Sequence, residues 1–315
     1  MTLRRLIAPA ALAAVSMLAL AGCTGTGTDA AASGDGRLQV VASTNVYGQI
    51  AEQIGGDLVD VTSIVSSAAQ DPHSFEATAK DQLTVSKADV IIENGGGYDA
   101  FVDALIDSSG SDAPVITAAS FSDAWPEDEA EADDHSHAPV EGFNEHVWYD
   151  PHTIEQVAGA IADELAALRP DGADTFQGNA DSFAAEIAGL ESSLAEIDAA
   201  HAGQRAFVTE PVPVYLVAAA GLDNATPDAF SEAVEAGQDV PPATLLESLT
   251  LLRDGGIGVV IVNAQTGGAE TTQITDEADA LGIPVIAFSE TLPEGQTYLS
   301  WMQANIEALA GALAQ

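Results

Sequence analysis

From residue 38 onward, short apolar runs alternate with stretches in which apolar residues recur every three or four positions. The short runs predict buried β-strands at 38–43, 58–65, 88–93, 114–118, 206–209, 257–263 and 283–288. The periodic stretches between them predict helices. Because strands and helices alternate in both halves of the chain, the pattern predicts an α/β fold with two lobes, each a mostly parallel sheet flanked by helices.

One periodic stretch is longer and more regular than the others. Its apolar positions are Phe183, Ile187, Leu190, Leu194 and Ile197. A helix over 177–200 would be about 36 Å long at about 1.5 Å per residue, which is enough to cross two lobes. A coiled-coil oligomer is the competing interpretation, but the heptad run is brief. We therefore expect two lobes joined by one long helix, in a monomer.

The first 22 residues have the features of a signal peptide. Arg4 and Arg5 precede an apolar run over 6–21 that ends in small residues. The sequence Leu20-Ala21-Gly22-Cys23 resembles the bacterial lipobox, which implies cleavage before Cys23 and lipidation of its thiol. An uncleaved membrane helix is the alternative, but the run is short for one. We expect a protein tethered by lipid at the extracytoplasmic face of the cell membrane.

These patterns divide the chain into five segments. A flexible, Gly- and Thr-rich tether follows the signal peptide, and the periodic α/β pattern begins at residue 38. An acidic loop without apolar period, 122–144, interrupts the first lobe. The segments are the signal peptide (1–22), the lipidated tether (23–37), the N-terminal lobe (38–152), the helical connector (153–203) and the C-terminal lobe (204–315).

Charge and cysteine content narrow the possible functions. The 315 residues include 8 Lys and Arg against 49 Asp and Glu, a net charge of −41. Nucleic acids and anionic lipid surfaces would repel such a chain, whereas cations would be attracted. The acidity could equally reflect solubility or adaptation to salt. The single cysteine excludes an internal disulfide and a Cys-based zinc cluster.

Four side chains form the candidate chemistry. His73 lies in the loop 71–76 and His146 in the loop 146–151, while Glu210 and Glu290 each follow an apolar strand of the second half. Taken singly, each is most simply an exposed polar loop residue. In open α/β sheets, however, ligands bind at the loops that leave the carboxyl ends of strands, and imidazole is a common metal ligand. We predict one metal site in the cleft, with two ligands from each lobe.

Further polar residues are candidates for supporting roles. Glu76 and Asp150 could orient the ligand imidazoles, as outer carboxylates often do. His135 and His137 lie in the acidic loop, where they could gather metal; a solvated loop without that role is an equal alternative.

Three motifs resemble one protein family, the zinc- and manganese-specific solute-binding lipoproteins of bacterial ABC transporters. They are DPHSFE (71–76), HVWYDP (146–151) and TYLSWMQANIEAL (297–309). The resemblance implies that His73 and His146 are ligands and that Glu210 is the third. The fourth family ligand is usually Asp, so Glu290 matches it with one extra methylene. The resemblance also implies a rigid linking helix, small closure movements and an ABC permease as partner.

The sequence leaves two candidate metals and more than one candidate activity. Two imidazoles with two carboxylates favour Mn²⁺ by ligand hardness, while the acidic His-bearing loop resembles zinc-specific members; we name both, with zinc ahead because of the loop. We expect capture and delivery of the ion without covalent chemistry. A metal-dependent hydrolase would need an open coordination position and a general base, and no H-E-x-x-H signature is present. A surface adhesin or a metallochaperone could use the same site.

Overall fold

Two four-stranded sheets, each parallel throughout, organise the two halves of the chain. The computed structural model describes residues 36–126, 140 and 142–315. The first sheet has the order β2-β1-β3-β4 and the second has the order β6-β5-β7-β8. Their strands are β1 (Leu38–Thr44), β2 (Val59–Val65), β3 (Val90–Glu93), β4 (Val115–Thr117), β5 (Arg205–Val208), β6 (Asp223–Asn224), β7 (Ile257–Asn263) and β8 (Val285–Phe288).

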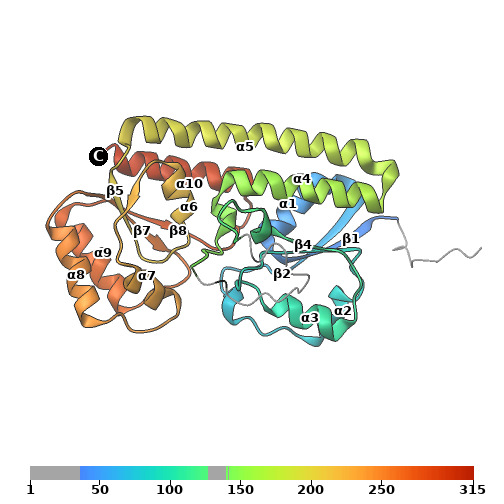
Figure 1. Cartoon of the computed structure of the whole chain (residues 1–315), viewed down its shortest axis with the longest axis horizontal. Helices are drawn as coiled ribbons and strands as arrows, with labels where there is room; N and C mark the ends of the chain where they lie inside the picture. Colours follow the sequence, from blue (N-terminus) through green and yellow to red (C-terminus); the bar gives the residue numbers. More distant parts are fainter. Residues whose placement is uncertain (1–35, 127–139, 141) are drawn as a thin grey trace, which may run out of the picture. The chain divides into compact units, whose positions relative to one another are not determined.

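Helices connect the strands and cover the sheets (Figure 1). The α-helices are α1 (Asn45–Gly55), α2 (Ala79–Val85), α3 (Phe101–Ser109), α4 (Pro151–Leu168), α5 (Ala173–His201), α6 (Val214–Ala219), α7 (Asp228–Glu235), α8 (Pro242–Arg253), α9 (Ala269–Leu281) and α10 (Tyr298–Leu313). Short 3-10 helices are η1 (Gly56–Leu58), η2 (Pro72–Ser74), η3 (Ala118–Phe121), η4 (Val147–Tyr149) and η5 (Pro170–Gly172).

The two central strands of the first sheet, β1 and β3, are buried on both faces, which explains why they appear in the sequence as nearly continuous apolar runs. Val40 and Ala42 of β1 face the core that contains α1, α4 and α5. Val41, between them, faces a second core with Val85 of α2 and Val102 of α3. Alternate side chains of one strand therefore stabilise two helical layers at once.

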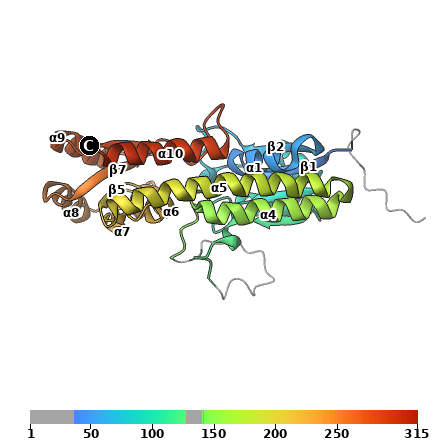
Figure 2. The same cartoon turned by 90° about the horizontal axis from the view of Figure 1, so that it is seen from above.

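The long helix α5 links the two lobes. It packs against α1 and α4 beside the first sheet and against α6 and α10 beside the second, and Figure 2 shows it running alongside α4 and α10. The largest core cluster includes residues of both sheets together with the buried face of α5. Within the described chain, both lobes belong to one compact unit.

Sequence patterns predicted this architecture, and the structure confirms the fold class while shifting several boundaries. The long helix begins at Ala173 rather than Gln177, because Phe176 is buried and extends the apolar face by one turn. Helix α3 begins at Phe101, a few residues after three consecutive glycines with positive φ. The two-residue strand β6 was missed because both of its residues, Asp223 and Asn224, are polar and exposed.

Some predicted features lie outside the described residues. They are the signal peptide, Cys23 and the histidines His135 and His137. Among the described residues, no helix combines the length and the apolar character needed to cross a membrane. The five segment boundaries stay predictions.

The buried face of α5 should contribute strongly to stability. Phe183 is fully enclosed, so we expect Phe183→Ala to lower the free energy of unfolding by about 3–5 kcal/mol. Urea unfolding followed by circular dichroism measures this change. Glu186 is exposed on the same helix, and Glu186→Ala should change the free energy of unfolding by no more than about 0.5 kcal/mol. An equal decrease in the free energy of unfolding in the two variants would contradict this packing.

Candidate metal centre

The candidate ligands lie where the strands of both sheets end. His73 is in η2, in the loop that leaves β2. Glu210 comes two residues after β5, and Glu290 comes two residues after β8. His146 directly precedes η4, in the connection between β4 and α4. The carboxyl ends of parallel strands share one edge of a sheet, so this edge of each lobe supplies side chains to a common region.

Local hydrogen bonds fix the loop that carries His73. The Asp71 side chain accepts a hydrogen bond from the His73 backbone N–H at 2.9 Å and another from the Ser74 hydroxyl at 2.8 Å. Pro72 between them is buried. The His73 ring lies edge-on to Tyr98, with ring centroids 4.9 Å apart. The motif Asp-Pro-His-Ser thus forms a capped turn that restricts where the imidazole lies.

An amide sets the orientation of His146. This histidine is 1% exposed, and its Nδ1 lies 2.7 Å from Oδ1 of Asn144. An amide oxygen only accepts hydrogen bonds, so Nδ1 carries the proton and Nε2 keeps its lone pair. The Asn144 amide nitrogen in turn donates to the carbonyl of Pro211, next to Glu210. Asn144 therefore prepares Nε2 as a ligand atom and connects this loop to the other lobe.

A second amide brings the two carboxylates side by side. The Nδ2 of Asn263 donates to Oε2 of Glu210 at 2.9 Å and to Oε1 of Glu290 at 2.6 Å. Glu210 also accepts a hydrogen bond from Thr266, and Glu290 accepts one from the Tyr98 hydroxyl at 3.3 Å. Both glutamates are buried, with exposures of 3% and 5%. These four hydrogen bonds, from three donor side chains, hold the carboxylates in defined positions.

Gln265 links the loops of the two lobes. Its Oε1 accepts hydrogen bonds from the backbone N–H groups of Glu290 and Thr291, at 2.7 and 2.9 Å. Its Nε2 donates to the carbonyl of Ala68 at 3.2 Å, in the loop that leads to His73. One side chain thus positions Glu290 and contacts the loop of His73.

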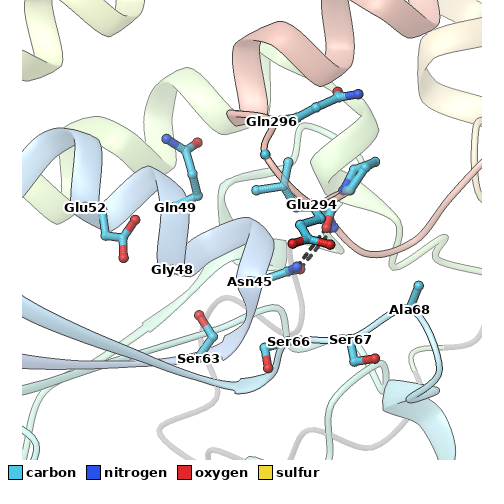
Figure 3. A pocket seen from close by; sticks show the side chains of 13 residues that line it. Asn45, Gly48, Gln49, Glu52, Ser63, Ser66, Ser67, Ala68, Glu294 and Gln296 are labelled. Carbon is cyan, nitrogen blue, oxygen red and sulfur yellow. Dashed lines mark hydrogen bonds between the residues drawn. The ribbon is translucent and has the colours of Figure 1, made fainter.

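A pocket of about 540 Å³ lies beside this link, with Ala68 in its lining. Asn45 at the start of α1 contributes to its wall and forms a pair of hydrogen bonds with the backbone of Leu292, at 2.9 and 3.0 Å (Figure 3). Ser63, Ser66 and Ser67 line the side formed by β2 and its following loop. Residues of both lobes therefore meet here through directed hydrogen bonds.

Three of the four predicted ligands form a tight group. His73, His146 and Glu290 each offer one ligand atom, and these atoms all lie within 4.8 Å of one another. Glu210 is outside this group but shares the Asn263 amide with Glu290. Two imidazoles and a carboxylate at these separations suit a divalent transition metal. That these four residues ligate an ion stays a prediction.

Burial shifts the pKa values of this group toward the neutral forms. Enclosure lowers the pKa of His146 well below its usual value, and the neighbouring His73 lowers it further. His73 is exposed as a whole, but neighbouring atoms shield part of its ring from water; this desolvation lowers its pKa, against the opposing effect of Asp71. Burial raises the pKa of Glu290 to about 7; hydrogen bonding to Asn263 opposes this, while the Glu210 charge adds to it. Neutral imidazoles are the form that binds metal.

A further glutamate approaches the site without having been predicted. Oε1 of Glu235, at the end of α7, lies 3.6 Å from Nε2 of His146. Burial raises the pKa of Glu235 to about 8, and the charges of Glu145, Glu210 and Glu290 raise it as well. No sequence signal distinguished Glu235, because a glutamate near a helix end is ordinary. Asn263 did carry a signal, since it is a polar residue that ends an apolar strand.

The predicted supporting carboxylates have other surroundings. Asp150 caps α4: it accepts hydrogen bonds from the His152 backbone N–H at 3.2 Å and from the Thr153 hydroxyl at 2.6 Å. The side chain that contacts Nδ1 of His146 is Asn144 instead. Glu76 is exposed, and in the described part of the chain its side chain forms no hydrogen bond with either histidine. Among the described residues, neither Asp150 nor Glu76 hydrogen-bonds to a candidate ligand imidazole, and their orienting role stays a prediction.

Comparison with known proteins identifies relatives over most of the chain. The family model described as ZnuA, zinc-uptake complex component A periplasmic, matches residues 40–312. The manganese-binding lipoprotein MntA of Halalkalibacterium halodurans is 25% identical over 309 residues, which cover 96% of each chain. The zinc-binding lipoprotein AdcA of Streptococcus pneumoniae serotype 4 is 27% identical over 286 residues, 87% of this chain and 56% of AdcA.

The fold is also shared with a solved structure. A crystal structure of ZnuA superposes with a TM-score of 0.69 at 21% identity, and the match covers 88% of this chain and 99% of that one. At this identity the likeness establishes the fold only. The similarity with MntA is nearly full length, whereas AdcA is the longer protein and this chain spans about half of it.

The raised pKa values predict a pH-dependent stability. From about pH 6.5 until the pH passes the folded pKa, about 7 for Glu290 and about 8 for Glu235, these carboxyls hold protons that the unfolded chain has released. The free energy of unfolding should therefore fall as pH rises, by about 1.4 kcal/mol per pH unit for each carboxyl that remains protonated. Urea unfolding of chelator-treated protein across this range measures the slope.

The same series tests which carboxyl is responsible. Glu235→Gln removes one titrating group with a pKa of about 8, so its slope should be shallower than that of the parent. Glu232 is exposed on the same helix, and its charge is the weakest of those that raise the pKa of Glu235. Glu232→Gln should therefore keep a slope close to that of the parent. A free energy of unfolding that increases with pH in the parent protein would contradict the assignment.

Proposed function

This chain belongs to the ZnuA family of periplasmic zinc-uptake components, and we propose that it is an extracytoplasmic solute-binding protein that captures Zn²⁺ or Mn²⁺ between its lobes. In this proposal the ion is the cargo, delivered to an ABC permease for import. His73, His146, Glu210 and Glu290 are the proposed ligands. The protein performs no covalent chemistry on the ion.

One observation carries the proposal. The ligand atoms of His73 and His146 from one lobe and Glu290 from the other lie within 4.8 Å of one another, and both histidines favour the neutral form that binds metal. Ligands from two lobes make binding dependent on the relative position of the lobes. Such a site can hold an ion and release it when a partner shifts one lobe, which is what delivery requires.

The names of the relatives support both candidate metals. MntA is named as a manganese-binding lipoprotein and AdcA as a zinc-binding lipoprotein. The proposed donor set contains nitrogen and oxygen but no sulfur, and both ions accept such a set. We also propose that Cys23 carries the lipid that anchors the mature protein as a monomer at the extracytoplasmic face of the membrane.

The ligand assignment predicts loss of binding in a double variant. His73→Ala with His146→Ala removes both nitrogen donors, so affinity for Zn²⁺ and for Mn²⁺ should fall by at least about a hundredfold, or about 2.7 kcal/mol. Equilibrium dialysis against each metal measures the affinity. The matched control is His152→Ala with His201→Ala, which removes two imidazoles from elsewhere on the chain. Unchanged binding in the first double variant would refute the assignment.

The transport role predicts a growth defect that depends on the same residues. Cells that lack this protein should grow poorly in chelated medium and recover when zinc or manganese is added back. The parent gene should restore growth, and the His73→Ala, His146→Ala gene should fail to do so although its product reaches the membrane. Normal growth of the deletion strain, combined with reduced attachment to surfaces, would favour an adhesin instead.

A further inference from the structure

A second group of ligand atoms lies next to the proposed site and shares one residue with it. His73, Glu145 and Glu235 each offer an atom, and these atoms all lie within 4.8 Å of one another. His73 therefore belongs to two groups, one completed by His146 and Glu290 and the other by Glu145 and Glu235. We call the first the inner group and the second the outer group.

The two groups differ in their access to solvent. His146 and Glu290 of the inner group are 1% and 5% exposed. Glu145 and Glu235 are half-buried, and His73 is exposed. An ion arriving from solution can therefore reach the carboxylates of the outer group while it still keeps part of its water shell, whereas the inner group requires further loss of water.

A buried histidine side chain points from the inner group toward the outer one. Nδ1 of His146 is bonded to Asn144, and its Nε2 faces Oε1 of Glu235 at 3.6 Å. That carboxylate oxygen is enclosed and has no hydrogen-bond partner among the described residues. An enclosed acceptor without a partner is costly unless something binds it. A cation between Glu235 and the imidazoles would supply the missing interaction.

We propose that His73, Glu145 and Glu235 form an entry site, which takes a divalent cation first and passes it to the inner group through His73. The inference rests on the proposed function, because it presupposes that the inner group binds the ion. Two carboxylates with one imidazole suit a hard, hydrated divalent cation such as Mn²⁺. Transfer requires only that one ligand, His73, stays within reach of the ion as the carboxylates are exchanged.

The kinetics of Mn²⁺ binding test this order. An entry site lies on the path both into and out of the inner group, so its loss slows both directions and leaves the equilibrium unchanged. For Glu235→Gln and for Glu145→Gln, we expect kon and koff each to fall about tenfold, a size typical of electrostatic effects on association. The Kd should stay within about twofold of the parent value. Stopped-flow mixing of the full chain with Mn²⁺, and with a chelator for release, measures both rates.

Glu232→Gln is the matched control, since it removes one negative charge from the exposed face of the same helix. Its kon should change by less than about twofold, because an exposed charge is screened by salt. Thermal unfolding confirms that each glutamine variant is folded.

Three results would overturn the entry site. A raised koff with a weaker Kd in Glu235→Gln would make Glu235 an ordinary ligand of the bound ion. Unchanged rates in both variants would remove any role for the outer group. Equal decreases of kon in Glu235→Gln and Glu232→Gln would mean that the ion is attracted only by the overall negative charge of the protein, without a specific entry site. Failure of the proposed function is a separate outcome, in which the parent protein itself shows no saturable binding of Zn²⁺ or Mn²⁺.

Discussion

Enclosed carboxylates that lie side by side are the constraint on which this site depends. Glu210 and Glu290 share the amide nitrogen of Asn263 and are almost fully buried. The charges that act on Glu235 are those of other glutamates. Anions brought together away from water destabilise the protein unless a proton or a cation neutralises them. Protons neutralise Glu235 and Glu290 up to about neutral pH, as their raised pKa values of about 8 and about 7 indicate. A bound divalent ion would neutralise the group at higher pH as well.

The carboxylates and histidines of the site come from both lobes, so they stay close together only if the two lobes keep a fixed relative position. Besides α5, direct hydrogen bonds cross between the two halves: the Tyr149 hydroxyl donates to the Ser289 carbonyl at 2.7 Å, and the Tyr298 hydroxyl donates to the Trp148 carbonyl at 2.9 Å. Tyr149 follows His146 by three residues, and Ser289 directly precedes Glu290. The ligand loops are therefore tied to each other through their neighbours. This arrangement favours small adjustments around the ion over a wide hinge opening.

Periodicity was sufficient to predict the fold, because the central strands are largely buried and the helices have regular apolar faces. The positions of His73, Glu210 and Glu290 were also accessible, since each follows a strand and strand ends share an edge. The supporting residues were not. Asn144 reaches His146 through a loop of irregular shape, and Glu235 approaches from a helix of the other lobe. Such contacts depend on tertiary packing, which leaves no period in the sequence. Asp150 illustrates that a carboxylate near a histidine in sequence can equally cap a helix.

The choice between zinc and manganese depends on how many oxygen donors reach the ion. For a given set of ligands Zn²⁺ binds more tightly than Mn²⁺, so preference for manganese must come from geometry and coordination number. Four ligands in a tetrahedron suit Zn²⁺. In the proposed order of binding, Glu145 and Glu235 release the ion as it passes to the inner group, so the bound ion keeps the two histidines, Glu210 and Glu290. A carboxylate can offer one or two oxygens to a metal. Selectivity between the two ions would therefore depend on whether Glu210 and Glu290 each bind through one oxygen or two.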